Sequence, residues 1–449
     1  MVHIAVMNHL IYDHESEHIF AFFGLKWYYI LKLGNFQMNK LIIKNFLSIQ
    51  YAEIELKPFT ILIGPQAAGK SIIAKLCYIF RSFDRILDRA LWLASGQRKA
   101  TTLVKEGFQQ LFCEIFPVYT WEEMIFSIAY ISDNFSITIK SRLNNLSVEL
   151  NDEYQEIITE KSKEMLGSQD ELFSSELLGI SDLEEYTAKK RKSYLARRIA
   201  YRKTPFFIPA GRAFFTIIDA NPYFFMDKNT NIDYFLREFG KSYVALGHPK
   251  FIARKRHMPL EYDIPLLNEK YIYDEAVQKA YLKRKDGSRI ELREASSGEQ
   301  EFLPLFLAIK TNVSYRYRPF IIEEPEAHLF PRTQIELVKL LVETVRGFSA
   351  RDFKLLITTH SPYILSAFNN LLYAGSIAAD SSKEETVIQK LNEIVPRTMQ
   401  IKPNTLSAYM VEHGSALSLI HEETGLISAE AIDEASDQLS QEFNELLEL

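Results

Sequence analysis

Two stretches of the chain combine residue types that handle phosphate and metal chemistry. The first, GPQAAGKS at 64–71, fits the pattern G-x-x-x-x-G-K-[ST] and lies between an apolar strand-like run and an apolar helix-like run. Glycines allow backbone N–H groups to curve around phosphates, Lys70 reaches the terminal phosphates, and the Ser71 hydroxyl ligates Mg²⁺. The residues predicted to hold a nucleotide are Gly64, Pro65, Gln66, Ala67, Ala68, Gly69, Lys70 and Ser71.

The second stretch, IIEEPEAH at 321–328, places two adjacent carboxylates directly after an apolar strand. Taken alone, it is equally consistent with a strand that emerges into a solvated loop, because buried carboxylates need a partner. With the phosphate loop present, we expect this strand to be a parallel neighbour of the strand before the loop, so that its acids meet the same phosphates. Glu323 would then hold Mg²⁺, through water, and Glu324 would orient or deprotonate the attacking water.

Four ordered motifs give the chain a family resemblance. KLIIKNFLSIQYAEIELKPFTILIGPQAAGKS, SSGEQE, IIEEPEAHLFP and LLITTHSPYIL together resemble the ABC-type ATPases of the chromosome-maintenance (SMC) and OLD-like group, over most of Met38 to about Ala374. The resemblance implies ATP and Mg²⁺ as cofactors, Mg-dependent ATP hydrolysis and at least a dimer. It also implies that a signature segment completes the ATP site of a second protomer, and this segment comprises Ser296, Ser297, Gly298, Glu299 and Gln300.

His360 matches the switch histidine of that family, and its position after an apolar strand allows the imidazole to sense the same phosphate. Some residues depart from the family pattern. Glu323 replaces the usual Asp, and Glu299 stands where transporters carry Gly, so its carboxylate must point away from phosphate or be paired. No glutamine can be assigned to the Q-loop, and Gln66 either faces the nucleotide or fills a solvent-exposed position.

A further stretch, FFIPAGRAFF at 206–215, resembles OLD-like defence ATPases, and the closest resemblance is to ATPase subunits of bacterial antiphage systems of the PARIS or Septu type. Arg212 in it either supports the phosphates or the interface, or forms a structural ion pair. The implied function is a regulatory ATPase that dimerises head to tail on ATP and controls a separate effector. About 89 residues follow His360 without a Toprim pattern, so we expect the nuclease, of Toprim or HNH type, to be another protein.

A second hypothesis is a DNA-binding, SMC-like ATPase of repair or replication. It rests on a basic segment within 189–203, which either contacts the phosphate backbone or is a solvated or protein-bound face. Its basic residues are Lys189, Lys190, Arg191, Lys192, Arg197, Arg198, Arg202 and Lys203. A transporter subunit is disfavoured, because the long interval from Ser71 to Ser296 implies an insertion that such subunits lack.

Strand-like and helix-like runs alternate around these motifs, which predicts an α/β fold with a mixed sheet, an antiparallel side sheet and a helical insertion. The strands IFSIAYI and FSITIKSRL are expected to form the side sheet, and a hairpin with an Asp-Gly turn is expected in AYLKRKDGSRIEL. We divide the chain into an ATPase head (38–151 and 204–420), a basic helical insertion (152–203) and an acidic C-terminal helix (421–449). That last helix either docks on its own domain or receives a basic partner.

The composition fits a globular protein of 449 residues, with 47% hydrophobic and 24% charged residues and a net charge of -6. No global basic field points to nucleic acid. Two cysteines make no disulfide framework and favour a reducing cytoplasm. The apolar run 19–33 is interrupted by Lys26 and Lys32 and is too short to span a membrane. Residues 1–37 are expected to be either an extension before the natural start or a packed or interfacial segment.

Overall fold

The computed structural model describes residues 39–94, 98–132, 135–142, 145–175, 204–217, 232–247, 261–274, 276–277, 279–315, 318–346, 353–380 and 382–428. The N-terminal extension, the basic segment 189–203 and residues 429–449 of the expected C-terminal helix lie outside these residues. Residues 421–428, expected to begin that helix, instead form turns and include an isolated antiparallel bridge between Ile420 and Ile427. Among the described helices, none has both the length and the low polarity that crossing a bilayer requires.

One mixed sheet of eleven strands forms the centre of the described structure, in the order β6-β5-β4-β1-β2-β15-β14-β3-β13-β12-β7. Its strands are β1 (Asn39–Phe46), β2 (Ile49–Glu55), β3 (Phe59–Ile63), β4 (Phe126–Ser132), β5 (Phe135–Arg142), β6 (Asn145–Leu150), β7 (Phe206–Ile208), β12 (Phe320–Glu323), β13 (Leu355–Thr359), β14 (Leu406–Glu412) and β15 (Ser415–Ser418). The strands from β14 to β7 are parallel to one another, and those from β6 to β2 are antiparallel.

A separate antiparallel sheet of four strands has the order β11-β10-β9-β8. It contains β8 (Glu261–Ile264), β9 (Glu269–Asp274), β10 (Lys279–Lys283) and β11 (Arg289–Glu291), and the expected hairpin with its Asp-Gly turn joins β10 to β11. The predicted α/β class with a mixed sheet and a separate antiparallel sheet is therefore confirmed. The strands expected to form that side sheet, β4 and β5, instead extend the main sheet through β1, because both edges of β1 are paired.

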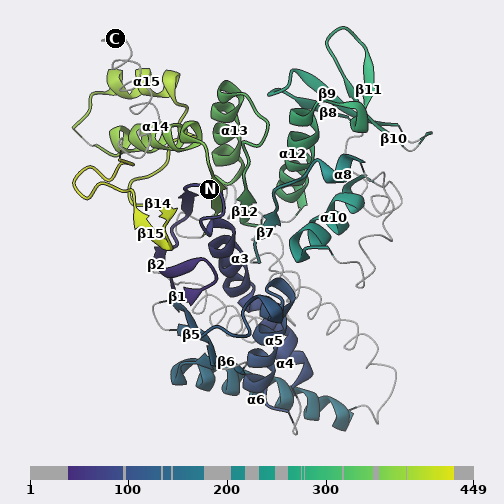
Figure 1. Cartoon of the computed structure of the whole chain (residues 1–449), viewed down its shortest axis with the longest axis vertical. Coiled ribbons are helices and arrows are strands. Elements are labelled where there is room, and N and C mark those ends of the chain that lie inside the picture. Colours follow the sequence, from purple (N-terminus) through teal and green to yellow (C-terminus); the bar gives the residue numbers. More distant parts are fainter. Residues whose placement is uncertain are drawn as a thin grey trace, which may run out of the picture.

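Helices cover both faces of the central strands (Figure 1). The described helices are α3 (Lys70–Arg81), α4 (Phe83–Leu93), α5 (Ala100–Ile115), α6 (Asp152–Ser175), α8 (Phe214–Ile217), α10 (Tyr234–Gly247), α12 (Ser297–Tyr315), α13 (Pro331–Thr344), α14 (Pro362–Ala379) and α15 (Glu385–Ile394), with short 3₁₀ turns at Val118–Thr120 and Leu292–Glu294. The expected helical insertion begins with α6, and its remainder lies outside the described residues.

Alternate residues of the central strands enter two different cores. Ile321 and Leu356 pack with α3, α4 and α5, whereas Ile322 and Ile357 pack with α12, α13 and α14. Because successive side chains of a strand point to opposite faces, a strand covered on both sides must be apolar throughout. This explains the uninterrupted burial of β3, β12 and β13.

Candidate nucleotide-binding site

The loop between β3 and α3 has the backbone that the glycine pattern requires. Gly64 and Gly69 adopt φ angles of 151° and 107°, which side-chain-bearing residues rarely adopt. Space is restricted as well, because a Cβ on Gly64 would lie 2.1 Å from the carbonyl oxygen of Val411 in β14. The loop therefore curves tightly against a neighbouring strand, and its N–H groups precede the N-terminus of α3, where anions are favoured.

Lys70 is buried in this loop, where its Nζ donates hydrogen bonds to the carbonyl oxygens of Gly64 (2.8 Å) and Pro65 (2.7 Å). Burial lowers the pKa of Lys70 below its ordinary value of 10.5, whereas the nearby carboxylates of Glu324 and Glu326 oppose this effect. The ammonium group therefore faces the acidic turn, which comprises residues 323–326 at the end of β12. Pro65, Gln66 and Ala67 are exposed on the outside of the loop.

The acids at the end of β12 are brought to the same place, although not in the manner predicted. We expected β12 to pair with β3, but β13 lies between them and pairs in parallel with both. The expectation was wrong because the strand that follows α13 inserts into the sheet beside β3. All three strands are parallel, so their carboxyl ends still meet at one edge of the sheet.

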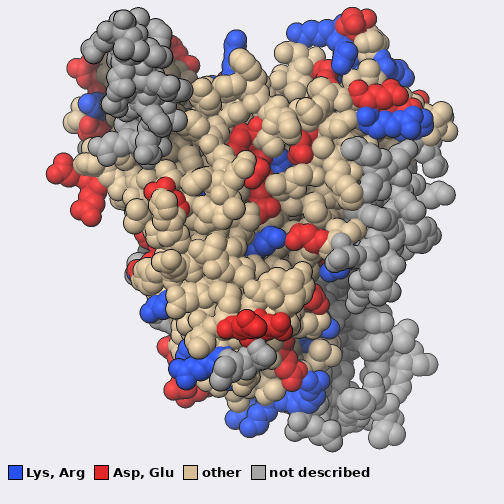
Figure 2. All heavy atoms as spheres, in the orientation of Figure 1, with Lys and Arg blue, Asp and Glu red and all other residues tan. Residues whose placement is uncertain are grey.

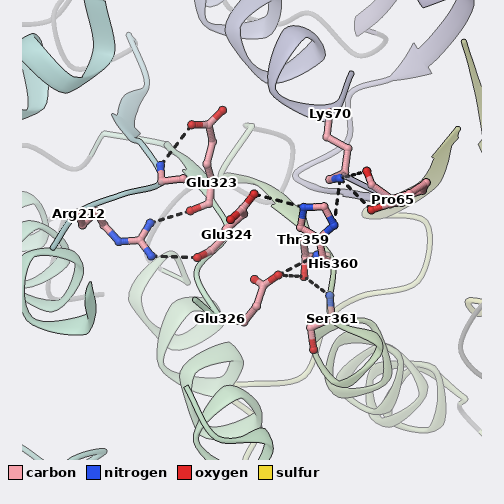
Figure 3. A network of polar contacts seen from close by, with 11 residues as sticks. Pro65, Lys70, Arg212, Glu323, Glu324, Glu326, Thr359, His360 and Ser361 are labelled. Atoms are coloured by element: carbon pink, nitrogen blue, oxygen red, sulfur yellow. Dashed lines mark hydrogen bonds and ion pairs between the residues drawn. The ribbon is translucent and has the colours of Figure 1, made fainter. Parts of the chain in front are cut away.

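His360 connects the phosphate loop to the acidic turn (Figure 3). Its Nδ1 lies 3.4 Å from Nζ of Lys70, and its Nε2 lies 3.3 Å from Oε1 of Glu324. An ammonium group can only donate and a carboxylate can only accept, so a neutral imidazole protonated at Nε2 satisfies both neighbours. Lys70, His360 and Glu324 therefore form a continuous polar chain across the sheet edge.

Glu324 has a backbone conformation that is unfavourable for a residue with a side chain, with φ at 42°. Its N–H donates to the carbonyl oxygen of Thr358 (2.9 Å), and its own carbonyl oxygen accepts from Arg212 (2.9 Å). The side chain remains 40% exposed, so its carboxylate is accessible to solvent. A carboxylate held in this way can orient a water molecule and accept a proton from it.

Glu323 is buried, and burial raises the pKa of its carboxyl above 4.5. Its Oε2 accepts from the N–H of Ala210 (3.3 Å), but its buried Oε1 makes no hydrogen bond within the described structure. Three neighbours favour the charged form of this carboxylate and oppose the rise in its pKa: the Ser71 hydroxyl, Lys75 and the Ala210 N–H. The Ser71 hydroxyl does not form a hydrogen bond with Oε1. An unsatisfied carboxylate oxygen beside a hydroxyl is a donor set that suits Mg²⁺.

The protein by itself offers few ligands for a metal here. Over the described ranges, no three His, Cys, Asp or Glu side chains converge on a point that would hold a metal ion. Ser71 and Glu323 would therefore need oxygen atoms from a phosphate and from water, which is how Mg²⁺ usually binds at phosphate sites. The residues present fit such an ion.

One neighbouring group, Glu326, was missed by sequence reasoning. Glu326 accepts hydrogen bonds from the Thr359 hydroxyl (2.7 Å) and from the N–H of His360 (2.8 Å), so it orients the end of β13. The signal available was a third acid in EEPE, two residues after Glu324. For Arg212, the structure selects the ion pair: its side chain is fully buried against Glu301 and does not reach the phosphate loop.

Within the described residues, no hydrogen bond or ion pair joins the predicted signature segment to the phosphate loop of its own chain. Ser296 precedes α12, and its N–H donates to Glu299 Oε2 (2.6 Å) while its Oγ accepts from the Glu299 N–H (3.4 Å). This reciprocal pairing is a capping box, which satisfies donors at the start of α12. Glu299 also lies 3.9 Å from Arg284, and Gln300 donates to the carbonyl oxygen of Arg293 (2.9 Å). Glu299 is therefore paired, as its replacement of Gly requires.

The molecular surface shows charges of both signs in the middle of one face, over the region where α3 and β12 meet in Figure 1 (Figure 2). The flanking surface on this face is largely uncharged. The contacts of Lys70, His360 and Glu324 place charged side chains from segments far apart in the sequence at the end of the parallel strands, as expected for a ligand site in an α/β sheet.

Comparisons with solved structures return distant similarities. The SMC head domain from Thermotoga maritima has 10% identity, a TM-score of 0.34, and coverage of 85% of this chain and 98% of that chain. An SMC head bound to the C-terminal winged-helix domain of ScpA has 13% identity, a TM-score of 0.39 and coverages of 86% and 98%. An SMC head with an extended coiled coil, bound to the C-terminal domain of ScpA derived from Pyrococcus furiosus, has 13% identity, a TM-score of 0.36 and coverages of 90% and 99%.

No curated protein matches the sequence. A family described as "AAA domain, putative AbiEii toxin, Type IV TA system" matches residues 59–366. This match runs from the first residue of β3 to the first turns of α14, and it includes the phosphate loop, the acidic turn and His360. The chain therefore belongs to this family of AAA-domain ATPases.

Proposed function

We propose that the protein binds and hydrolyses ATP with Mg²⁺ at the edge where β3, β12 and β13 end. The observation that carries this proposal is the contact of His360 with both Lys70 and Glu324. Through it, the phosphate loop and the acids belong to one site. A loop that binds phosphate and a carboxylate that activates water are both needed for hydrolysis of a triphosphate.

Each residue has a separate role in this proposal. Backbone N–H groups of 64–71 and the Lys70 ammonium bind the phosphates, and Ser71 and Glu323 hold the metal ion. Glu324 orients the attacking water and accepts its proton, while His360 senses the terminal phosphate. A bound Mg²⁺ would neutralise the developing phosphate charge.

The signature segment supports a dimer in which two chains complete each other's sites. Its hydrogen bonds and ion pairs within the described structure join it to Arg284, Arg293 and its own capping box. If this segment contacts a nucleotide, a second copy of the chain must supply that nucleotide. ATP-dependent head-to-tail dimerisation follows from that arrangement.

We further propose that the dimer is the regulatory subunit of a bacterial antiphage complex and that it controls a separate nuclease of Toprim or HNH type. Two observations support this: the PAGR, SSGEQE and SPYIL motifs, and a family description that names a toxin–antitoxin system, which is a system of more than one component. ATP occupancy would change the dimer and thereby the effector.

A second candidate function, a DNA-binding ATPase of repair or replication, is favoured by the eight basic residues within 189–203. Salt-dependent binding to duplex DNA that is lost when these eight residues are neutralised would select this candidate. If no binding to duplex DNA is detected at low salt, this candidate is excluded.

The primary experiment is isothermal titration of the protein with MgATP, together with the Lys70→Ala variant. Wild type is expected to bind, and Lys70→Ala to lose binding, because the buried ammonium is the cation at the phosphates. Lys339→Ala, which removes a partly exposed lysine paired with Glu336 on α13, is the matched control and should bind as wild type does. If wild type takes up no nucleotide, the proposal is wrong.

A further inference from the structure

One fully buried arginine connects the acidic turn to α12. The Arg212 side chain is 0% exposed. Its NH1 group donates to the carbonyl oxygens of Glu323 (2.7 Å) and Pro209 (2.9 Å), and its NH2 group donates to the carbonyl oxygen of Glu324 (2.9 Å). One side of the guanidinium therefore donates hydrogen bonds to the backbone of both acids (Figure 3).

The opposite side of the guanidinium is anchored on α12. Arg212 Nε donates to the carbonyl oxygen of Glu301 (3.2 Å) and lies 3.5 Å from its Oε2, and the backbone N–H of Arg212 donates to that same Oε2 (2.9 Å). Glu301 is itself buried. A buried ion pair in which each guanidinium nitrogen donates to an oxygen is an arrangement in which removal of one partner is costly.

The acidic turn needs such an anchor. Glu324 is held at a positive φ of 42°, a strained conformation for a residue with a Cβ that persists only where its surroundings impose it. Hydrogen bonds from Arg212 to two consecutive carbonyl oxygens, together with the bond from the Glu324 N–H to Thr358, hold it here. Arg212 is thus one of the groups that set the direction of the Glu324 side chain.

A second contact joins the same two parts of the molecule. A Cβ added to Gly298 would lie 2.9 Å from the carbonyl oxygen of His328, so the first turn of α12 packs directly on the loop that follows the acids. Gly298 belongs to the signature segment, and Glu301 lies one turn further along α12. Any displacement of the start of α12 is therefore transmitted to the acidic turn at two points.

We propose that Arg212 is a positioning residue for hydrolysis, which fixes the backbone of Glu323 and Glu324 and couples it, through Glu301, to the signature end of α12. The inference rests on the proposed ATPase function. Engagement of the signature segment by a second protomer would thereby adjust the acids of the same chain. Arg212 touches neither the nucleotide loop nor the reacting atoms, so it acts only through the acids.

The test compares Arg212→Lys with wild type in nucleotide affinity and in turnover measured separately. A lysine ammonium is a point charge, and it lacks the planar set of donors with which the guanidinium bonds the carbonyl oxygens of both acids. We expect the dissociation constant for MgATP to stay within about threefold, since 64–71 is unchanged, and kcat to fall at least about tenfold, because small misplacements of catalytic groups have effects of this size.

Arg318→Lys is the matched control. Arg318 is also buried and donates to the backbone carbonyl oxygens of Thr204 (2.8 Å) and Pro205 (2.7 Å), but at the opposite end of β7 and β12. It should lose thermal stability to a similar extent while kcat per folded molecule stays within about twofold. A structural role for Arg212 would make the two variants alike in kcat.

Glu301→Gln provides a second route to the same answer, because it keeps the shape and the main-chain acceptor and removes only the charge. We expect kcat to fall several-fold, and the effects of Arg212→Lys and Glu301→Gln to be less than multiplicative when combined. If Arg212→Lys does not fold, Glu301→Gln alone decides. Wild-type kcat in either folded variant overturns the inference, whereas an inactive wild type overturns the proposed function instead.

Discussion

His360 lies between a group that only donates hydrogen bonds and a group that only accepts them. The ring connects the Lys70 ammonium to the Glu324 carboxylate over distances of 3.4 and 3.3 Å. Replacement of either neighbour leaves one ring nitrogen without its partner, so the three side chains behave as one unit. For this reason, variants at these positions are not expected to have independent effects.

Replacement of the exposed acid tests its role directly. Glu324→Gln keeps the side-chain shape and a contact with His360 but cannot accept a proton, so we expect hydrolysis to fall by about 10²-fold or more with MgATP binding retained. Steady-state phosphate release and equilibrium binding measure the two quantities. Glu336→Gln, on the exposed face of α13, is the control. Normal turnover by Glu324→Gln would show that another group activates the water.

At the level of the elements, α14 depends on a glycine that packs against the main chain. A Cβ on Gly375 would lie 1.7 Å from the carbonyl oxygen of Ile401. Gly375→Ala should therefore destabilise the protein by more than about 2 kcal/mol, because backbone must move to relieve the clash. Chemical denaturation measures this loss. Ala378→Gly, at an exposed position in the last turn of α14, should cost only about 0.5–1 kcal/mol.

The carboxyl group of Glu269 in β9 makes stability depend on pH. Burial, followed by the neighbouring Glu299, raises its pKa from 4.5 to about 7, and Arg284 opposes this shift. The folded state therefore binds more protons than the unfolded state between these values, so stability should fall as the pH rises from about 4.5 to about 7. The loss is on the order of 1–2 kcal/mol, allowing for the coupling to Glu299.

Thermal unfolding of wild type and Glu269→Gln at pH 5 and at pH 8 measures this effect. The glutamine side chain is neutral at every pH, so the midpoint temperatures of the variant at pH 5 and at pH 8 should differ much less than those of wild type. An equal difference in both proteins would assign the pH dependence to other groups. The experiment also reports on α12, because Glu299 caps its first turn.

For the whole molecule, the proposed head-to-tail dimer predicts complementation between inactive variants. Lys70→Ala lacks phosphate binding, and Ser297→Asp places a charge at an exposed position of the signature segment. Mixed in equal amounts, they should recover up to about a quarter of the wild-type activity, because half the dimers are mixed and each has one intact site. Phosphate release by the mixture, compared with each variant alone, is the measurement. No recovery would contradict the head-to-tail arrangement.

Assembly itself should follow the nucleotide. Glu324→Gln with MgATP should shift from the mass of one chain to that of two, because ATP that is not hydrolysed keeps the two halves of each site together. Light scattering with and without MgATP measures the change. An unchanged mass would show that nucleotide binding does not cause dimerisation.

Local sequence was sufficient to predict the alternation of strands and helices and that residues 64–71, the acids after β12 and His360 lie at the ends of neighbouring elements. A glycine pattern and a strand followed by acids each depend on residues within about one turn or one strand of each other. Such features can be predicted from composition and spacing alone. The α/β class follows from them, because buried parallel strands must be apolar on both faces.

Only the tertiary structure decided the order of the strands and the partners of the buried charges. β13 separates β3 from β12, and β14, which comes from the end of the described chain, packs against Gly64. The partners Arg212 and Glu301 are 89 residues apart in sequence, so no local pattern could pair them. The strand order and the ion-pair partners depend on which segments, distant in sequence, bury their surfaces against each other, and that is a property of the folded chain as a whole.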